Sequence, residues 1–284
     1  MSALLNTFYR FFFFLGLLLL TWSIFLNISS LMLISSDSKD ILPLPEGSNE
    51  IYDKNFETIN NLEGLKSLIR SEIDNRNYEG IDIPIFIDDI VRKKYFHQTA
   101  YLAPNTNWVL KIFDLLFPSK EFLTAMDPKH LVKKNHGICN QQAIIFQEMI
   151  KDYEFQFASI GFDIKIPEQE NFGHFVSAVK IQEDWFYFDS NMEPNYDRSD
   201  PSIFSRVLEA DKGLLKKLYP EYDFSLVNKD MIIFKDLNIF PAKKGVMFQK
   251  ITQFLSNFSW IFFLMLAFVL RYIKNKINLK RKIL

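Results

Sequence analysis

Two long apolar runs mark the two ends of the chain. The first, FFFFLGLLLLTWSIFL, covers Phe11 to Leu26 and continues through Asn27-Ile28-Ser29-Ser30 to the apolar residues Leu31 to Ile34. The second covers Ile251 to Leu270. Each reaches the about 20 residues that a helix needs to cross the hydrocarbon core of a bilayer. We therefore predict an N-terminal transmembrane anchor over residues 1–35 and a C-terminal transmembrane helix over residues 251–272.

Two other interpretations of these runs stay open. Arg10 precedes the first run, as in a secretory signal, but no Ala-x-Ala-like cleavage site follows it. Either run would also fit a buried core helix, although both lie at the ends of the chain beside polar stretches. We favour two uncleaved membrane helices.

The charges that flank the second run suggest an orientation. A basic tail over residues 273–284 follows the run directly, with Arg271 just before it. Under the positive-inside rule such a tail stays in the cytoplasm. Both termini are then inside, and residues from about 36 to 249 face the other side, which suggests a bacterial inner membrane with a domain facing the periplasm or the outside. Three lysines just before the run oppose this orientation: Lys243, Lys244 and Lys250.

The pattern between the two runs changes from helical to strand-like. Residues 36–126 contain a polar linker with prolines (Ser36 to Glu46), apolar residues at helical spacing from Ile59 to Ile69, and candidate helices over 85–100 and 108–117. Asp127-Pro128 is typical of a helix start and predicts a short helix to about Lys134. An apolar stripe from Gln141 to Lys151 then predicts a mostly buried helix.

Alternation of apolar and polar positions begins at Phe155 to Ile160, where Gly161 ends it. His174 to Ile181 and Trp185 to Asp189 form a predicted hairpin, and a helix over 202–218 and a short strand over 231–234 follow. We assign residues 127–240 to one α+β core, in which a helix packs on an antiparallel sheet.

The hairpin fixes an expected register. If its strands pair about a point between Gln182 and Glu183, His174 lies opposite Asn191 and Asp189 lies opposite Val176. His174 and Asp189 are then diagonal neighbours on one face, within side-chain reach. A turn with one residue more or fewer would place them on opposite faces.

Composition excludes several classes of function. The net charge is −1, from 33 basic and 34 acidic side chains, and no basic stripe with interleaved aromatic residues is present, so we expect no nucleic-acid partner. The single cysteine excludes an internal disulfide. No HExxH or CxxC spacing occurs, so we expect no metal and no cofactor.

The single cysteine, Cys139, follows a Gly137 turn and opens the predicted buried helix. The N-terminus of a helix carries a partial positive charge, which favours a thiolate nucleophile. A histidine that accepts the thiol proton and a carboxylate that orients its ring complete an acyl-transfer site. His174 and Asp189 are the candidates, with Asn191 as an alternative orienting group.

These residues resemble the transglutaminase-like superfamily of papain-like thiol enzymes. Gly137-x-Cys139 at a helix start, Gly173-His174 at a strand start and the strand that ends in Asp189 carry the resemblance. It implies a papain-like, transglutaminase-like core with Cys139 as nucleophile, His174 as general base and acid, and Asp189 as the orienting group. The chain also resembles membrane-anchored bacterial members. It departs from the family at Ile138 and Ser190, where an aromatic residue and a proline are usual.

The backbone N–H of Cys139 is the expected first donor to the oxyanion of the acyl intermediate. The second donor stays open among Gln141, Gln142, Asn135 and the more distant Trp108. We interpret the remaining histidines, His97, His130 and His136, as surface, structural or loop residues.

The sequence thus predicts a membrane-anchored thiol enzyme that acts on amide or ester bonds of a peptide or protein substrate through a Cys139 acyl-enzyme. Hydrolysis is slightly favoured over transfer to an amine. The alternative is a catalytically inactive binding or assembly module of the cell envelope. In that case Cys139 would be buried, unreactive or apart from His174.

Overall fold

The computed structural model describes most of the chain and divides it into two compact units. The described residues are 2–33, 50–102, 107–118, 122–164, 172–191, 196–220, 222–235 and 237–283. Unit 1 consists of Met1–Pro43, Leu102–Leu123 and Met247–Leu284, and unit 2 consists of Leu44–Tyr101 and Thr124–Val246. The segment expected as a polar linker, residues 36–46, lies outside the described residues.

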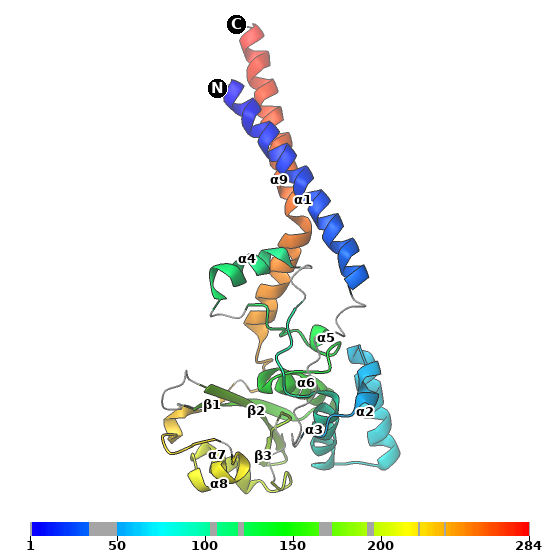
Figure 1. Cartoon of the computed structure of the whole chain (residues 1–284), viewed down its shortest axis with the longest axis vertical. Helices are drawn as coiled ribbons and strands as arrows, with labels where there is room; N and C mark the ends of the chain where they lie inside the picture. Colours follow the sequence, from blue (N-terminus) through cyan, green and yellow to red (C-terminus); the bar gives the residue numbers. More distant parts are fainter. Residues whose placement is uncertain are drawn as a thin grey trace. The chain divides into compact units, whose positions relative to one another are not determined.

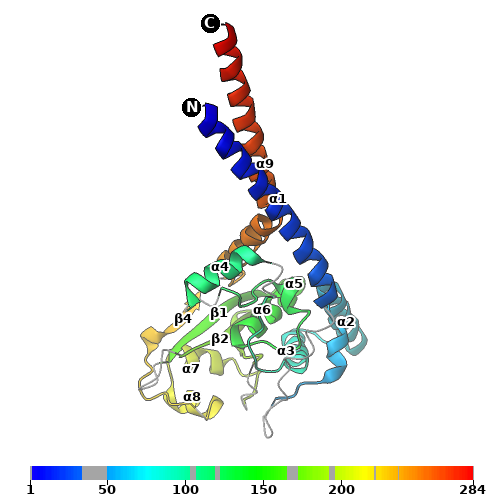
Figure 2. The same ribbon diagram turned by 45° about the horizontal axis from the view of Figure 1, so that its top comes forward.

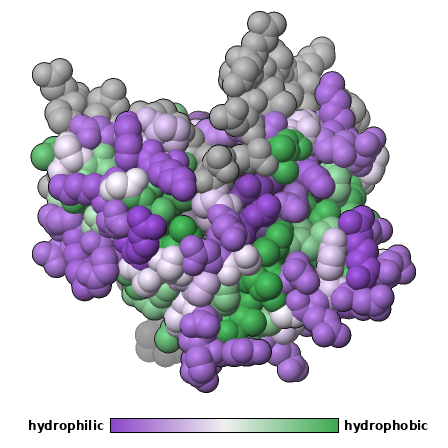
Figure 3. Space-filling model, turned by 90° about the horizontal axis from the view of Figure 1, so that it is seen from below, coloured by the Kyte–Doolittle hydropathy of each residue, from purple (hydrophilic) through white to green (hydrophobic). Residues whose placement is uncertain are grey.

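Unit 1 contains the long apolar helix α1 (Ser2–Leu33), all of the long helix α9 (Lys243–Ile283) from Met247 on, and one short helix, α4 (Trp108–Leu116). Stretches of both long helices, Ala3–Ile28 and Lys243–Leu279, are long and apolar enough to cross a membrane. Their large apolar side chains are exposed, for example Leu18 at 65% and Phe262 at 64%. By contrast, the face of the molecule in Figure 3 carries mainly hydrophilic side chains, with narrower apolar areas between them.

The helices α1 and α9 pack against each other in opposite directions (Figures 1 and 2). The rings of Phe12 and Phe263 stack with their centroids 6.1 Å apart. One turn further along α1, Gly16 lies so close to Leu264 that an added Cβ would meet its side chain at 2.8 Å. Small residues permit this close approach of two apolar helices.

Unit 2 combines helices with an antiparallel sheet, which confirms the predicted α+β class. Its elements in chain order are η2 (Lys54–Thr58), α2 (Leu62–Arg76), α3 (Asp82–Lys94), α5 (Pro128–Leu131), α6 (Cys139–Ile150), η4 (Lys151–Tyr153), β1 (Gln156–Ile164), β2 (Phe172–Ile181), β3 (Asp184–Phe188), α7 (Ser202–Leu208), α8 (Lys212–Leu218), η5 (Lys229–Met231) and β4 (Ile232–Lys235).

The sheet has the order β3-β2-β1-β4, and each neighbouring pair is antiparallel. In the β2–β3 hairpin, Ile181 pairs with Asp184 and Ser177 with Phe188. This is the predicted register about Gln182 and Glu183. Gln182 has a positive φ of 56°, which is the backbone conformation that a tight two-residue hairpin turn requires.

Helices cover both faces of the sheet, and Figure 1 shows α7 and α8 on the other side from α6. On the α6 side, Gln147 donates to Ser177 Oγ at 2.9 Å and Phe146 stacks on Phe188. On the other side, α7 and α8 pack with the sheet into one hydrophobic cluster that includes Val176 and Tyr187. The sheet is therefore a central layer between two helical layers.

Several boundaries differ from the sequence prediction: the helix expected over 85–100 is α3, which ends at Lys94, and two further differences lie in the core. Gly161 does not end β1, because it pairs with Phe175 on one side and with Ile233 on the other in the middle of the sheet. The predicted helix over 202–218 is two helices. Ala210 between them has a positive φ of 53°, and Asp211 caps α8 by accepting from Leu214 N at 3.0 Å. A polar cap inside an otherwise amphipathic stretch thus starts a new helix.

Candidate active site

Cys139 is the first residue of α6, as predicted, and the loop before it is held by backbone hydrogen bonds. Phe96 N donates to Asn135 O at 3.1 Å, and Gly137 N donates to Phe96 O at 3.0 Å. A Cβ at Gly137 would come within 3.3 Å of the Gln141 side chain, so this position favours glycine. The thiol is half-buried at the start of the helix, where backbone N–H groups have no partner within the helix.

Gln141 fastens the start of α6 to two other segments. Its side-chain nitrogen donates to Ala100 O and to Ala125 O, both at 2.8 Å. Its side-chain oxygen accepts from Ala100 N at 2.9 Å and from Ile138 N at 3.1 Å. Because these four bonds occupy the amide of Gln141, this side chain is a structural clamp rather than the second oxyanion donor.

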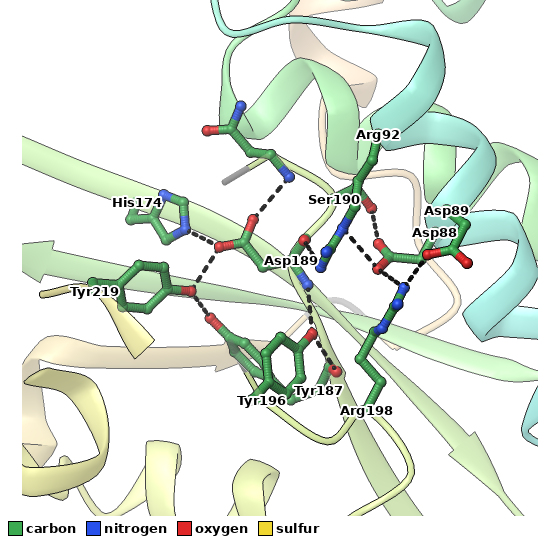
Figure 4. Close-up of polar contacts among 11 residues, drawn as sticks. Asp88, Asp89, Arg92, His174, Tyr187, Asp189, Ser190, Tyr196, Arg198 and Tyr219 are labelled. Atoms are coloured by element: carbon green, nitrogen blue, oxygen red, sulfur yellow. Dashed lines mark hydrogen bonds and ion pairs between the residues drawn. The ribbon is translucent and has the colours of Figure 1, made fainter. Parts of the chain in front are cut away.

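His174 and Asp189 come together as the register predicts. Nε2 of His174 lies 2.7 Å from Oδ2 of Asp189, and Figure 4 shows the two groups facing each other. Asp189 is fully buried and His174 is 5% exposed. The Cys139 side chain lies close enough to His174 to contribute to the raised pKa of the imidazole. The structure therefore brings together all three residues that the sequence selected.

Electrostatic interactions determine the protonation states of His174 and Asp189. Burial by itself lowers the pKa of His174, but the Asp189 carboxylate and the Cys139 sulfur outweigh it and raise the pKa of His174 to about 10. Burial by itself raises the pKa of Asp189, whereas His174 and two further hydrogen bonds hold it below its ordinary value. The arrangement therefore favours an imidazolium beside a carboxylate.

Three tyrosines surround Asp189, and sequence reasoning did not select them. Tyr219, just after α8, donates to Oδ2 of Asp189 at 2.7 Å, and Tyr187 lies within hydrogen-bond distance of the Tyr219 hydroxyl. Tyr196 accepts from Asp189 N at 3.3 Å and donates to Tyr187 O at 3.1 Å. Since the proton of Tyr219 goes to the carboxylate, Tyr187 is the donor to Tyr219 (Figure 4).

Aromatic rings also enclose the imidazole of His174. Phe162 stacks on it with centroids 5.9 Å apart and an interplanar angle of 15°, and Tyr219 meets it edge-on at 5.0 Å. The ring is thus held by a carboxylate at one nitrogen and by two aromatic side chains. No sequence motif predicts a role for Tyr219, because this residue reaches the site only through the packing of α8 on the sheet.

A buried charge cluster supports the backbone at Asp189. Arg92 on α3 donates from Nη2 to Asp189 O at 2.7 Å, and its Nε lies 3.1 Å from Asp88 Oδ2. Asp88 also accepts from Ser190 Oγ at 2.5 Å and pairs with Arg198 at 3.0 Å (Figure 4). The sequence analysis did not select this cluster, although two opposite charges four residues apart within an apolar stretch, Asp88 and Arg92, are a signal that could have indicated it.

Other sequence candidates have different partners. The indole N–H of Trp108 donates to Ser256 O at 3.0 Å within unit 1. Among the hydrogen bonds of the described residues, none joins the Asn191 side chain to the imidazole of His174. Its side-chain oxygen lies 2.8 Å from His97 Nδ1, and its backbone N–H donates to Asp189 Oδ1 at 3.0 Å. Asp189, rather than Asn191, is therefore the residue that contacts the His174 ring nitrogen.

Two further candidates for the second oxyanion donor already have acceptors. Gln142 donates to Gly137 O at 2.8 Å, and Asn135 donates to the Tyr52 hydroxyl at 3.2 Å. His136, in the same loop, packs its ring against Phe96. Among the described residues, no group of three or more His, Cys, Asp or Glu side chains is arranged to hold a metal ion.

A comparison with protein-family models gave a match. Residues 73–199 match the family model of the transglutaminase-like domain. The chain therefore contains a transglutaminase-like domain, and the match includes Cys139, His174 and Asp189 but ends before Tyr219. No match to the chain was found among curated proteins or solved structures.

Proposed function

We propose that this protein is a membrane-anchored thiol enzyme that acts on amide or ester bonds through an acyl-enzyme on Cys139. The observation that carries the proposal is the contact of one imidazole with two partners, the Cys139 thiol and the Asp189 carboxylate. A thiol is only a few per cent ionised near neutral pH, so a nearby base makes it a useful nucleophile.

The chemistry follows from the positions of these groups. The Cys139 sulfur attacks the carbonyl carbon of the substrate while its proton resides on His174. The first-turn N–H groups of α6, beginning with Cys139 N, receive the oxyanion. The imidazolium then gives its proton to the leaving amine or alcohol as the bond to the carbonyl carbon breaks. The thioester that remains is released when His174 takes a proton from the second nucleophile and this nucleophile attacks the same carbon.

Asp189 serves this cycle by holding the imidazole and stabilising its protonated form. We propose water as the usual second nucleophile, which makes the reaction a hydrolysis of a peptide or protein substrate. Transfer to an amine shares the first half of the reaction and differs only in the second nucleophile, which is an amine instead of water. The alternative is an inactive binding module, and the experiment below distinguishes it from an enzyme.

The decisive measurement is the rate at which a small iodoacetamide probe alkylates Cys139 in the full-length protein in detergent. The chain has a single cysteine, so the label reports on one residue. We expect fast alkylation well below pH 8 in the wild type. In His174→Ala the rate should fall by at least roughly ten-fold. His136→Ala is the matched control, since this histidine lies in the loop before Cys139, and its rate should equal that of the wild type.

Slow alkylation that is equal in all three proteins would contradict the proposal and favour the binding module. If the thiol is activated, incubation with peptide esters and amides should leave an acyl group on Cys139, detectable by intact mass. Adding a primary amine then separates the two outcomes: an amide product indicates transfer, and free acid alone indicates hydrolysis.

We also propose that α1 and α9 anchor the protein in a bacterial inner membrane, with both termini in the cytoplasm and residues 127–240 on the opposite side. The antiparallel packing of the two helices and the basic tail over residues 273–284 support this orientation. In spheroplasts, protease added from outside should degrade a tag inserted at the Glu183 turn and spare a C-terminal tag. The reverse pattern would invert the orientation.

A further inference from the structure

The short helix α4 has an apolar face that nothing in the described part of the chain covers. Its sequence, WVLKIFDLL, contains two charged residues, and these pair with each other, since Lys111 Nζ lies 3.2 Å from Asp114 Oδ2. Ile112, Leu115 and Leu116 are 45%, 68% and 65% exposed. Their spacing of three and four places them on one side of a helix.

This exposed face is not the face that packs in the protein. The opposite side of α4 carries Leu110, which is fully buried, and Phe113, whose ring meets Phe248 edge-on at 5.3 Å. Phe122 completes this aromatic group, with centroids 5.4 Å from Phe248. The helix therefore already has its packing partner in unit 1, and the outer face is an additional apolar surface.

A buried polar joint fastens the start of α4 to α9. Asn107 is 1% exposed, caps α4 by accepting from Leu110 N at 3.1 Å, and donates to Thr252 Oγ1 at 3.0 Å. Ser256 accepts from Val109 N at 3.0 Å and donates to Asn107 Oδ1 at 3.0 Å. Polar groups satisfied within the protein in this way can lie near hydrocarbon without large cost.

The joint lies where α9 enters its apolar run. It spans Gln249 to Ser256, and the apolar run begins at Ile251. At a rise of about 1.5 Å per residue, Ser256 is about 7.5 Å inside that run. Figure 1 shows α4 lying at a wide angle to α9 rather than along it. A short amphipathic helix across a membrane helix at this level lies along the membrane surface, where such helices bury an apolar face by about 5–10 Å.

We infer that α4 is a third membrane contact, with Ile112, Leu115 and Leu116 inserted among the acyl chains at the bilayer surface. The inference rests on the proposed membrane location of α1 and α9. The occupant of this face is lipid because α4 is bonded to the stretch of α9 around Thr252 and Ser256, where the large apolar side chains of α9 are exposed as well: Ile251, Phe254 and Leu255. The chain leaves unit 2 at Tyr101 and returns at Thr124, so α4 attaches the domain to the membrane independently of the two chain ends.

Single-cysteine labelling tests this inference. In full-length Cys139→Ser protein, one cysteine is introduced at a time, labelled with an environment-sensitive nitrobenzoxadiazole dye, and reconstituted into phosphatidylcholine vesicles with or without brominated acyl chains. The test positions are Leu115→Cys and Ile112→Cys. Phe262→Cys on α9 is the membrane control, and Glu183→Cys, at a side chain that is 94% exposed, is the water control.

We expect the dye at positions 115 and 112 to show blue-shifted emission and quenching by brominated lipid, as at position 262. The dye at position 183 should show neither effect. Quenching at 262 without quenching at 112 or 115 would overturn the inference about α4 and leave the anchor intact. Lack of quenching at 262 as well would overturn the anchor and the inference with it. Efficient crosslinking between two copies through position 115, without lipid quenching, would assign this face to a protein partner and contradict the lipid contact.

Discussion

Tyr219 donates a 2.7 Å hydrogen bond to the same oxygen of Asp189 that faces His174, although the two residues are separated by 30 positions in the chain. Tyr219 follows α8 and Asp189 follows β3, so the bond joins the helical layer to the edge of the sheet. It also fixes which lone pair of the carboxylate remains for the imidazole. We therefore regard Tyr219 as a positioning residue of the proposed site.

Tyr219→Phe should slow the alkylation of Cys139 about ten-fold, because one hydrogen bond to a charged group contributes about 1.5–3 kcal/mol. The phenyl ring retains the edge contact with His174, so only the hydroxyl is tested. Tyr153→Phe, on η4, is the control and should alkylate at the wild-type rate. If Tyr219→Phe melts at the same temperature and alkylates at the same rate as the wild type, the hydroxyl has no positioning role.

The i,i+4 pair of Asp88 and Arg92 on α3 should matter far more than the similar pair of Glu72 and Arg76 on α2. The first pair is almost fully buried, whereas Arg76 is 54% exposed. We expect Arg92→Met to lower the free energy of unfolding by about 3–5 kcal/mol, because it leaves a buried carboxylate short of one partner.

Arg76→Met should change the free energy of unfolding very little, because solvent screens this exposed pair. Urea titrations of the two variants, followed by tryptophan fluorescence, check both expectations. The double change Asp88→Asn with Arg92→Met should recover part of the loss, since it removes the unpaired charge. Equal effects of the two arginine substitutions would show that the buried cluster does not support the site.

The titration of His174 should depend on Asp189. The pKa of His174 is raised from an ordinary 6.5 to about 10, so the ring should stay protonated through neutral pH and lose its proton only near pH 10. Asp189→Asn removes the carboxylate that raises the pKa, and deprotonation should move to lower pH. Histidine NMR resonances, with His174 assigned by its absence in His174→Ala, measure this directly. An unchanged titration in Asp189→Asn would contradict the assigned coupling.

The same shifts predict how stability depends on pH. A folded pKa above the unfolded value means that His174 stabilises the fold below pH 6.5 and that this contribution disappears between pH 6.5 and about 10. Asp189 has a lowered pKa, so its contribution is present above its ordinary 3.8 and is lost on further acidification. The difference in unfolding free energy between the wild type and His174→Ala should therefore shrink as pH rises from 6.5 to 10. A difference that stays constant over this interval would contradict the raised pKa.

Gln141→Leu should destabilise the domain, because four hydrogen bonds to backbone groups are lost at once, although Ala100 O keeps its second bond, from Ala125 N. Each buried group left without a hydrogen bond costs about 1–3 kcal/mol, partly relieved by relaxation, so we expect a total loss of about 3 kcal/mol or more. Gln156→Leu at an exposed position of β1 is the control, with an expected effect within about 0.5 kcal/mol. A neutral Gln141→Leu would show that the clamp is not structural.

Local patterns in the sequence were enough to predict the start of α6 at Cys139 and the register that pairs His174 with Asp189. Both depend on turn chemistry and on period-two alternation, which neighbouring residues determine. The continuation of β1 through Gly161 could not be predicted, because it depends on strands on either side that lie far away in the sequence. Tyr219 and Arg92 reach Asp189 only through tertiary packing, so their roles leave little trace in local sequence.

The hydrogen bond from Leu102 N to Leu123 O, at 2.8 Å, has a practical consequence. The segments by which the chain leaves and re-enters unit 2 are paired by backbone hydrogen bonds, since Ala125 N also donates to Ala100 O. The two backbone ends are so close that a glycine-rich bridge of a few residues can replace the entire excursion. Combined with truncation at both termini, this excision offers a route to a detergent-free version of the thiol domain for crystallisation and substrate screening.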